Sequence, residues 1–349
     1  MMQTIWFILV AFMLTAYVVL DGFDLGAGAL HLIAARNNDE RRLLLRSIGP
    51  VWDGNEVWLL AAGGTLFYAF PLLYASSFSG FYLPLCIVLW LLVWRAISIE
   101  FRAHLDNSIW RDFFDGMFSI ASVLLLVLFG AALGNVIRGV PLGPDHYFFV
   151  PLWTDFAPGP NPGALDWYTA LCALMAVAAA SLHGALYVVM KTTGPLRDRM
   201  AAIASRLWLV VAIGTIAGLA ATVAVRPRVL DNYRSAPAGW IIPAAVVVAL
   251  GGIRYCSRHA SERNAFLCSC GYLTAMLAGA AFALYPALLP SGNDPALSLT
   301  IWNSSAGPSS LSIGLIWWSI GMVIAIGYFV LVYTMFRGKV DTHGGDGHY

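Results

Sequence analysis

Long apolar runs separated by short polar segments dominate the chain. A helix needs about 20 mostly apolar residues to cross a bilayer, and the pattern predicts nine such spans. Acidic residues interrupt the second half of the first span and the start of the second. We therefore expect an all-α, polytopic membrane protein with nine transmembrane helices. The predicted spans are residues 5–31, 53–75, 77–99, 114–137, 164–189, 205–225, 239–256, 265–289 and 311–336.

The composition agrees with this fold class. Only 11% of the 349 residues are charged, against about 25% in soluble domains. This excludes a soluble enzyme, a disordered chain and a nucleic-acid-binding protein, and a β-barrel is disfavoured because its strands alternate apolar and polar residues. The first basic residue is Arg36, so the first run lacks the positive start of a signal peptide. The five cysteines form no CxxC pair; we interpret them as buried, inert thiols and expect no metal site.

The basic residues predict the orientation of the chain. Of the 20 Lys and Arg residues, 16 fall in one set of loops or in the tail, and 4 fall in the opposite loops. Cytoplasmic loops carry an excess of Lys and Arg. We therefore expect the N-terminus outside and the C-terminus in the cytoplasm, which an odd number of spans requires.

Two long loops divide the chain. Residues 138–163 are rich in proline, glycine and aromatic residues, and residues 290–310 are polar, so both predict irregular periplasmic loops. The expected domains are a first four-helix bundle over 1–137, a second over 164–289, a ninth helix over 311–336 and a disordered cytoplasmic tail over 337–349. His343 and His348 in the tail make a poor metal site.

Acidic residues are concentrated in the first bundle, where 10 of the 19 precede residue 120. Burying an ionisable residue in a membrane is costly, so such residues are the first functional candidates. Members of two pairs are spaced three residues apart, which places each pair on one helix face. We predict a proton path that opens to the cytoplasm. Its candidates are Asp21, Asp24, Asp53, Glu56, Glu100 and Asp115, with Arg95 as counter-ion.

The alternative interpretation is that these acids cap helix ends and form interfacial ion pairs. Their neighbours in the sequence help to distinguish it from a proton path. That alternative is favoured for Asp106 and Asp112. Gly22, Gly26 and Gly28 give the first span a small face that another helix can approach closely. The segment 52–58 places two carboxylates and an amide between two indoles, which is costly unless the polar groups meet partners.

Histidine and tryptophan are the side chains to consider for a cofactor. His183 is the mid-span histidine, and Trp52 and Trp58 flank the acids of the second span. We name these three as cofactor-binding candidates, with a packing role the better interpretation for His183. No dinucleotide, phosphate or nucleophile motif is present, so we predict no catalytic residue in this chain.

Two ordered motifs resemble a known family. Residues 21–28 (DGFDLGAG) resemble a signature of subunit II of cytochrome bd-type quinol oxidases, and residues 49–59 (GPVWDGNEVWL) are similar to a second signature at the expected spacing. The resemblance covers nearly the whole chain. It continues through residues 78–82, 94–96, 100–102, 130–141, 191–195, 284–286 and 298–301.

The resemblance implies a heterodimer in a bacterial plasma membrane. Its subunit I carries haem b and haem d and oxidises quinol, either ubiquinol or menaquinol, and the complex reduces O2 to water. Subunit II supplies a proton path from the cytoplasm, and the acids that match Asp24 and Asp53 belong to it. Small single-span accessory subunits, membrane lipid and a structural quinone are further expected partners.

Two other classes of function share some of these features. A proton- or cation-coupled secondary transporter also needs intramembrane acids, but predicted spans five to eight carry almost none, which argues against alternating access. A purely structural membrane scaffold is the third interpretation, in which the acids affect only stability.

Overall fold

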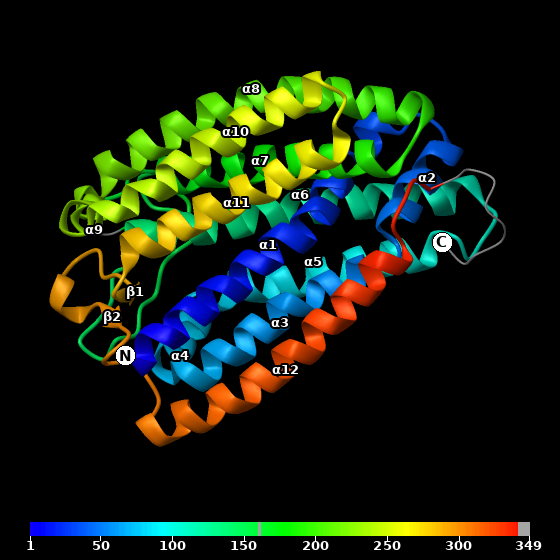
Figure 1. The fold of residues 1–349 in the computed structure, drawn as a ribbon. Helices are drawn as coiled ribbons and strands as arrows, with labels where there is room; N and C mark the ends of the chain where they lie inside the picture. Colours follow the sequence, from blue (N-terminus) through cyan, green and yellow to red (C-terminus); the bar gives the residue numbers. More distant parts are fainter. Residues whose placement is uncertain (160–161, 341–349) are drawn as a thin grey trace.

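The computed structural model describes residues 1–159 and 162–340, and most of them are helical. The long helices lie side by side in an elongated bundle, with the amino terminus and the two short strands at the same end (Figure 1). The elements in chain order are α1 (Met2–Ala34), α2 (Asn38–Ile48), α3 (Trp52–Ala69), α4 (Pro71–Gly80), α5 (Tyr82–Phe101), α6 (Ser108–Arg138), α7 (Trp167–Lys191), α8 (Gly194–Val225), η1 (Pro227–Leu230), α9 (Asp231–Ser235), η2 (Pro237–Trp240), α10 (Ile241–Arg258), α11 (Glu262–Leu284), β1 (Ala287–Leu289), η3 (Pro295–Leu297), β2 (Leu299–Thr300) and α12 (Pro308–Met335).

Eight helices within the described residues are long and apolar enough to cross a membrane. They are α1, α5, α6, α7, α8, α10 with the preceding η2, α11 and α12. The chain is thus a polytopic helical membrane protein. Helix α3 is not one of the eight, and it carries Asp53 and Glu56 in its first turns. The part of the predicted tail that holds His343 and His348 lies outside the described residues.

Helix α1 lies between the other helices because small residues in its second half admit two neighbours (Figure 1). A Cβ atom on Gly26 would overlap the Ala180 carbonyl group of α7, and one on Gly28 would overlap the Ser122 side chain of α6. Small residues of this kind allow membrane helices to approach closely. The predicted small face is confirmed at these two positions, whereas a Cβ on Gly22 would make only an ordinary contact.

The predicted second span, residues 53–75, is broken in the structure. Helix α3 ends at Ala69 and α4 begins at Pro71, after Phe70 adopts a non-helical ψ of 65°. A proline disfavours the helical conformation of the residue before it, so Pro71 accounts for the break. The next span is α5, which begins at Tyr82 and not at residue 77.

The second half of the chain also differs from the prediction at its boundaries. Helix α8 begins at Gly194 and not at residue 205, and α11 ends at Leu284 and not at 289. The residues after α11 form β1, which pairs antiparallel with β2. The predicted loop 290–310 therefore contains a strand as well as the start of α12. The five cysteines are free, and they are half-buried and not fully buried as expected.

Candidate functional site

The candidate site is built on a continuous buried stretch of α1. Every residue from Asp21 to His31 is buried. Asp21 and Asp24 are one turn apart on this stretch, so they share a helix face, and neither has exposed surface. Carboxyl groups at this depth need partners because burial of a polar group without compensation is costly.

Asp21 is held by Arg95 of α5. Nη2 of Arg95 donates to Oδ1 of Asp21 over 2.5 Å, and Nη1 donates to Oδ2 over 3.0 Å. Nη1 also lies 3.4 Å from Oε2 of Glu56 in α3. Paired bonds between a guanidinium and a carboxylate are strong and directional, and Arg95 and Asp21 are both fully buried. The structure thus places the predicted counter-ion between two of the predicted acids.

Asp24 has a different environment. Its Oδ2 accepts a hydrogen bond from Nδ2 of Asn55 over 2.7 Å, and its Oδ1 has no hydrogen-bond partner among the described residues. Nδ2 of Asn55 also donates to the Leu20 carbonyl over 3.1 Å, and Oδ1 of Asn55 accepts from the Tyr333 hydroxyl over 2.9 Å. Asn55 therefore links α1, α3 and α12 through one amide. We call Asp21, Asp24, Asn55, Glu56 and Arg95 the Asp24 cluster.

Three of the predicted acids are not brought into this cluster, and two of these lie on the surface of the chain. Asp53, in the first turn of α3, and Glu100, near the end of α5, are both exposed on the chain. Glu56 lies between the interior and the surface, because its side chain is 21% exposed while it contacts Arg95. Glu56 therefore lies between the buried cluster and Asp53, which is exposed on the same face of α3.

Asp115 belongs to a separate cluster at the end of α1. Arg102 donates to it twice, from Nε to Oδ1 over 2.6 Å and from Nη2 to Oδ2 over 3.0 Å. Nε2 of His31 lies 2.6 Å from Oδ1, and Nη1 of Arg41 donates to Oδ2 over 3.1 Å. His31 is seven residues after Asp24, about 10 Å farther along the helix. We call Asp115, His31, Arg41 and Arg102 the Asp115 cluster.

Several contacting residues were not predicted from the sequence. Asn55 stands between two predicted acids in the second motif, so its position was a usable signal. Tyr333 offered none, because its contact with Asn55 joins residues 278 positions apart. Arg102 and His31 were not among the predicted site residues, although both contact Asp115.

The three predicted cofactor candidates are all buried in the chain. Both ring nitrogens of His183 have protein partners, with Ser269 Oγ at 2.7 Å from Nδ1 and the Val19 carbonyl at 2.9 Å from Nε2. Trp52 lies under the Arg95 guanidinium, 5.9 Å from ring centre to Cζ, and Trp58 is 7% exposed. Within the described ranges, no three His, Cys, Asp or Glu side chains are placed to hold a metal ion.

A large apolar cavity lies between α1 and the second half of the chain. Its volume is about 760 Å³, and its wall is formed by α1, α6, α7, α8, α10 and α11 with the segment before α10. Polar atoms enter it from a few tyrosines and threonines, including Tyr17, Tyr168 and Thr215. Sites for small organic ligands have this size and this mostly apolar lining. None of the three cofactor candidates lines the cavity.

Comparisons with known proteins agree over almost the full length. The model of the family described as cytochrome bd terminal oxidase subunit II matches residues 2–336. "Probable cytochrome oxidase subunit 2" of Haemophilus influenzae is 35% identical, over 98% of this chain and 96% of that protein. "Cytochrome bd-I ubiquinol oxidase subunit 2" of Escherichia coli K12 is 32% identical, over 95% and 92%. The bd oxidase structure from Geobacillus thermodenitrificans shares the fold, with a TM-score of 0.76 at 15% identity over 96% of this chain and 98% of that one.

Proposed function

Since the chain belongs to the family of cytochrome bd terminal oxidase subunit II, we propose that it is the non-haem subunit of a respiratory quinol:oxygen oxidoreductase. It is a multi-pass protein of the bacterial inner membrane. The observation that carries the proposal is the match of the family across residues 2–336. A partner subunit I holds haem b and haem d and oxidises ubiquinol or menaquinol. The relatives give no support to the alternative of a secondary transporter.

The assignment of the haems to a partner rests on the buried histidines of this chain. His183 has protein partners at both ring nitrogens, and Nε2 of His31 is engaged by Asp115. Haem iron is held by axial ligands such as a histidine nitrogen. His183 does not fit that role, because both of its ring nitrogens are engaged, and this supports a partner as the haem-bearing subunit.

The topology that we propose has nine spans, with α3 as the ninth member of the set. Supporting it, α3 runs beside α1 and α12 (Figure 1), and Asn55 bonds to both of these helices. The 16-to-4 distribution of basic residues supports an external N-terminus and a cytoplasmic C-terminus. The two bundles, 1–137 and 164–289, the periplasmic loops 138–163 and 290–310 and the helix 311–336 complete this arrangement.

Subunit I covers the outer face of α3 in this proposal. Asp53 is exposed there, next to the part-exposed Glu56. Ionisable residues at membrane depth face the interior of a bundle or water and are rarely in contact with lipid. A partner protein would give this face such an environment, and small single-span accessory subunits and lipid would cover other apolar surfaces such as that of α12.

The proton path that we propose runs through the Asp24 cluster. Protons enter beside Asp53 and Glu56, and Asp24 passes them towards the haems of subunit I. Asp24 suits a relay because one of its oxygens has no hydrogen-bond partner in the described chain. Arg95 balances the charge of Asp21 and Glu56 beside it. We leave Glu100 and Asp115 outside the path, because Glu100 is exposed elsewhere and the oxygens of Asp115 are held by cations.

The apolar cavity is where we place a structural quinone. An isoprenoid chain would fill the apolar wall, and hydroxyl groups such as those of Tyr17 and Thr215 would meet the carbonyl groups of the ring. Extraction of the purified complex tests this proposal. One quinone retained per complex after removal of exchangeable quinol supports it, and none contradicts it.

Purification of the tagged chain tests the main proposal. We expect it to bring down a haem-bearing partner with quinol-dependent oxygen consumption. A chain that is isolated from its native membrane without haem protein or oxidase activity would contradict it. Solute uptake by vesicles that contain the chain alone would favour a transporter instead.

Asp53→Asn tests the proposed entrance of the path. We expect slower oxygen consumption with normal haem content, because the exposed acid no longer delivers protons to Glu56. Asp106→Asn is the matched control, since Asp106 is an exposed acid that pairs with Arg111. Unchanged turnover in Asp53→Asn, with normal haem content, would remove Asp53 from the path.

A further inference from the structure

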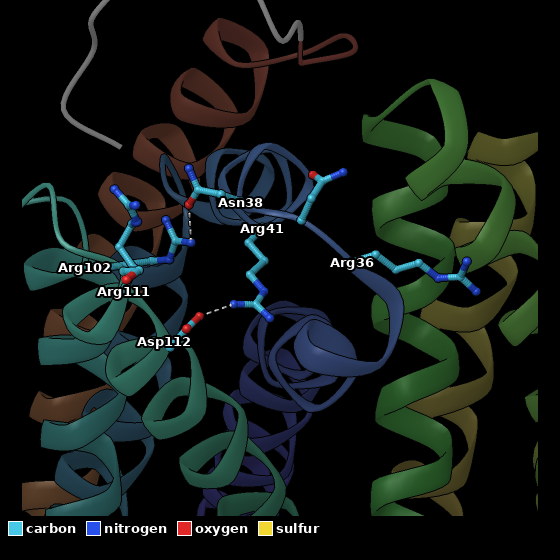
Figure 2. A pocket seen from close by; sticks show the side chains of 8 residues that line it. Arg36, Asn38, Arg41, Arg102, Arg111 and Asp112 are labelled. Atoms are coloured by element: carbon cyan, nitrogen blue, oxygen red, sulfur yellow. Dashed lines mark hydrogen bonds and ion pairs between the residues drawn. The ribbon is translucent and has the colours of Figure 1, made fainter.

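A second pocket lies at the end of the bundle opposite the strands, and four arginines line it. Its volume is about 270 Å³. Figure 2 shows Arg102 and Arg111 on one side of it, Arg36 on the other, and Arg41 between them above Asp112. These residues come from three separate parts of the chain: the α1–α2 connection and start of α2, the end of α5, and the start of α6. The complete lining is Arg36, Asn37, Asn38, Arg41, Arg102, Ser108, Arg111 and Asp112.

The acids near this pocket do not neutralise all of its arginines. Asp112 and Asp115 pair with Arg41, and Asp115 also pairs with Arg102. Arg111 contacts Asp106, whose side chain is 97% exposed and therefore contributes little screening at the pocket.

Arg36 is the basic residue of the lining that lies in the α1–α2 connection. Its side chain is exposed, and the hydrogen bond that the structure records for this residue uses the backbone N–H, which donates to Glu40 over 2.7 Å. Glu40 forms its ion pair with Arg199. Partial burial opposes ionisation of Glu40, but hydrogen bonds from Arg199 and from the Arg36 backbone lower its pKa. The ionised Glu40 pairs with Arg199, and the charge of the Arg36 guanidinium attracts it less strongly.

Two helices also begin at this pocket. Helix α2 begins directly after its N-cap residue Asn37, and α6 begins directly after its N-cap residue Asn107. Residues of both first turns line the pocket. The N-terminal end of a helix carries partial positive charge and favours phosphate and other anions. The helix ends and the arginines therefore favour the same kind of ligand, and guanidinium groups match the geometry of phosphate oxygens.

Large apolar side chains close in sequence to the lining residues are exposed. Leu32 and Ile33 precede Arg36 at the end of α1, with 43% and 69% of their surface exposed. Ile109 and Phe113 of α6 are 80% and 62% exposed. A ligand with a phosphate group and acyl chains would contact both kinds of surface, and basic pockets between membrane helices on the cytoplasmic side bind phospholipid headgroups.

We propose that this arginine pocket binds a phosphate group, with an anionic phospholipid as its source. Arg36, Arg41 and Arg111 contact the phosphate oxygens, and the acyl chains lie over the exposed side chains of α1 and α6. The site is distinct from the proton path and does not depend on the proposed oxidase activity.

The test uses the purified, delipidated complex in neutral detergent. Short-chain phosphatidylglycerol, the matching phosphatidylcholine and inorganic phosphate are titrated separately, and bound ligand is counted by native mass spectrometry. We expect phosphatidylglycerol to bind and phosphatidylcholine to bind weakly. In the double variant Arg36→Gln/Arg111→Gln we expect the affinity for phosphatidylglycerol to fall about 25-fold. Each arginine near an anionic lipid contributes a factor of about five, and the variant removes two of them.

The matched control is Arg258→Gln/Arg263→Gln, which removes two exposed positive charges near the α10–α11 turn, away from this pocket. We expect the control to bind phosphatidylglycerol like the unaltered complex. Binding of inorganic phosphate as tight as that of phosphatidylglycerol, lost in the pocket variant, would keep the phosphate site but overturn the lipid source. Equal affinity in the two double variants, or no binding by either phosphatidylglycerol or inorganic phosphate, would overturn the site itself.

Discussion

The Asp24 cluster and the Asp115 cluster each contain a buried carboxyl group, but the two carboxyl groups have different hydrogen-bond partners. Asp115 receives hydrogen bonds from Arg102 and Arg41 and lies 2.6 Å from His31. Asp24 receives one hydrogen bond from a neutral amide, and one of its oxygens has no partner in the described chain. Burial alone therefore does not identify a functional acid.

The difference indicates two roles. A buried charge with several fixed partners stabilises a fold only as long as every partner remains, and it has little freedom to exchange a proton. A buried carboxyl with few partners does little for stability and is retained at a cost. We infer that Asp115 fixes the junction of α1, α2, α5 and α6, and that Asp24 carries protons.

The largest expected effect is that of Asp115→Asn. The amide cannot neutralise Arg102 and Arg41, and breaking a buried ion pair costs about 3–5 kcal/mol. We expect strongly reduced yield of haem-containing complex and a lower midpoint of thermal unfolding. Asp112→Asn is the control, because Asp112 also pairs with Arg41 but its side chain is 67% exposed. Normal yield and stability of Asp115→Asn would remove the structural role.

An intermediate effect is expected for Asn55→Leu. Leucine has a similar volume but cannot donate to Asp24, so the complex should assemble while oxygen consumption falls roughly tenfold, or about 1.4 kcal/mol in activation free energy. Turnover per haem is the measurement. Thr65→Val in the same helix is the control, since the Thr65 hydroxyl donates to the Met13 sulfur and not to the Asp24 cluster. If the two variants turn over equally, Asn55 does not position Asp24.

The smallest expected effect is that of Tyr333→Phe. The change removes one hydrogen bond to Asn55, worth about 1 kcal/mol, while Asn55 keeps its bonds to Leu20 and Asp24. We expect turnover within about twofold of the unaltered complex. Tyr328→Phe, at an exposed position of the same helix, controls for loss of a hydroxyl. A loss as large as that of Asn55→Leu would place Tyr333 in the path itself.

The sequence predicts the helices well because each apolar run is a local signal of bilayer length. It missed the break between α3 and α4, although Pro71 is the local signal for it. It also placed the end of α11 too late, because the pairing of β1 with β2 depends on residues that follow a loop. Local patterns locate elements, and the contacts between distant segments decide where they end.

The same limit applies to the site. Helix spacing was enough to place Asp21 and Asp24 on one face, since they are neighbours in one helix. The distinction between Asp24 and Asp115 needed Asn55, Arg102 and Tyr333, which come from other helices. Spacing within a helix shows which acids lie together, whereas their partners depend on tertiary packing.

The central claim is that Asp24 carries protons to the site of oxygen reduction. The direct test is the rate of proton uptake, followed with a pH-sensitive dye after oxygen is mixed with the fully reduced complex, in the unaltered protein and in Asp24→Asn. Asparagine keeps the oxygen that Asn55 contacts, so haem content should be normal. We predict uptake slowed roughly tenfold or more, as for loss of a proton-transferring side chain. Unchanged uptake in an Asp24→Asn complex with normal haem content would contradict it.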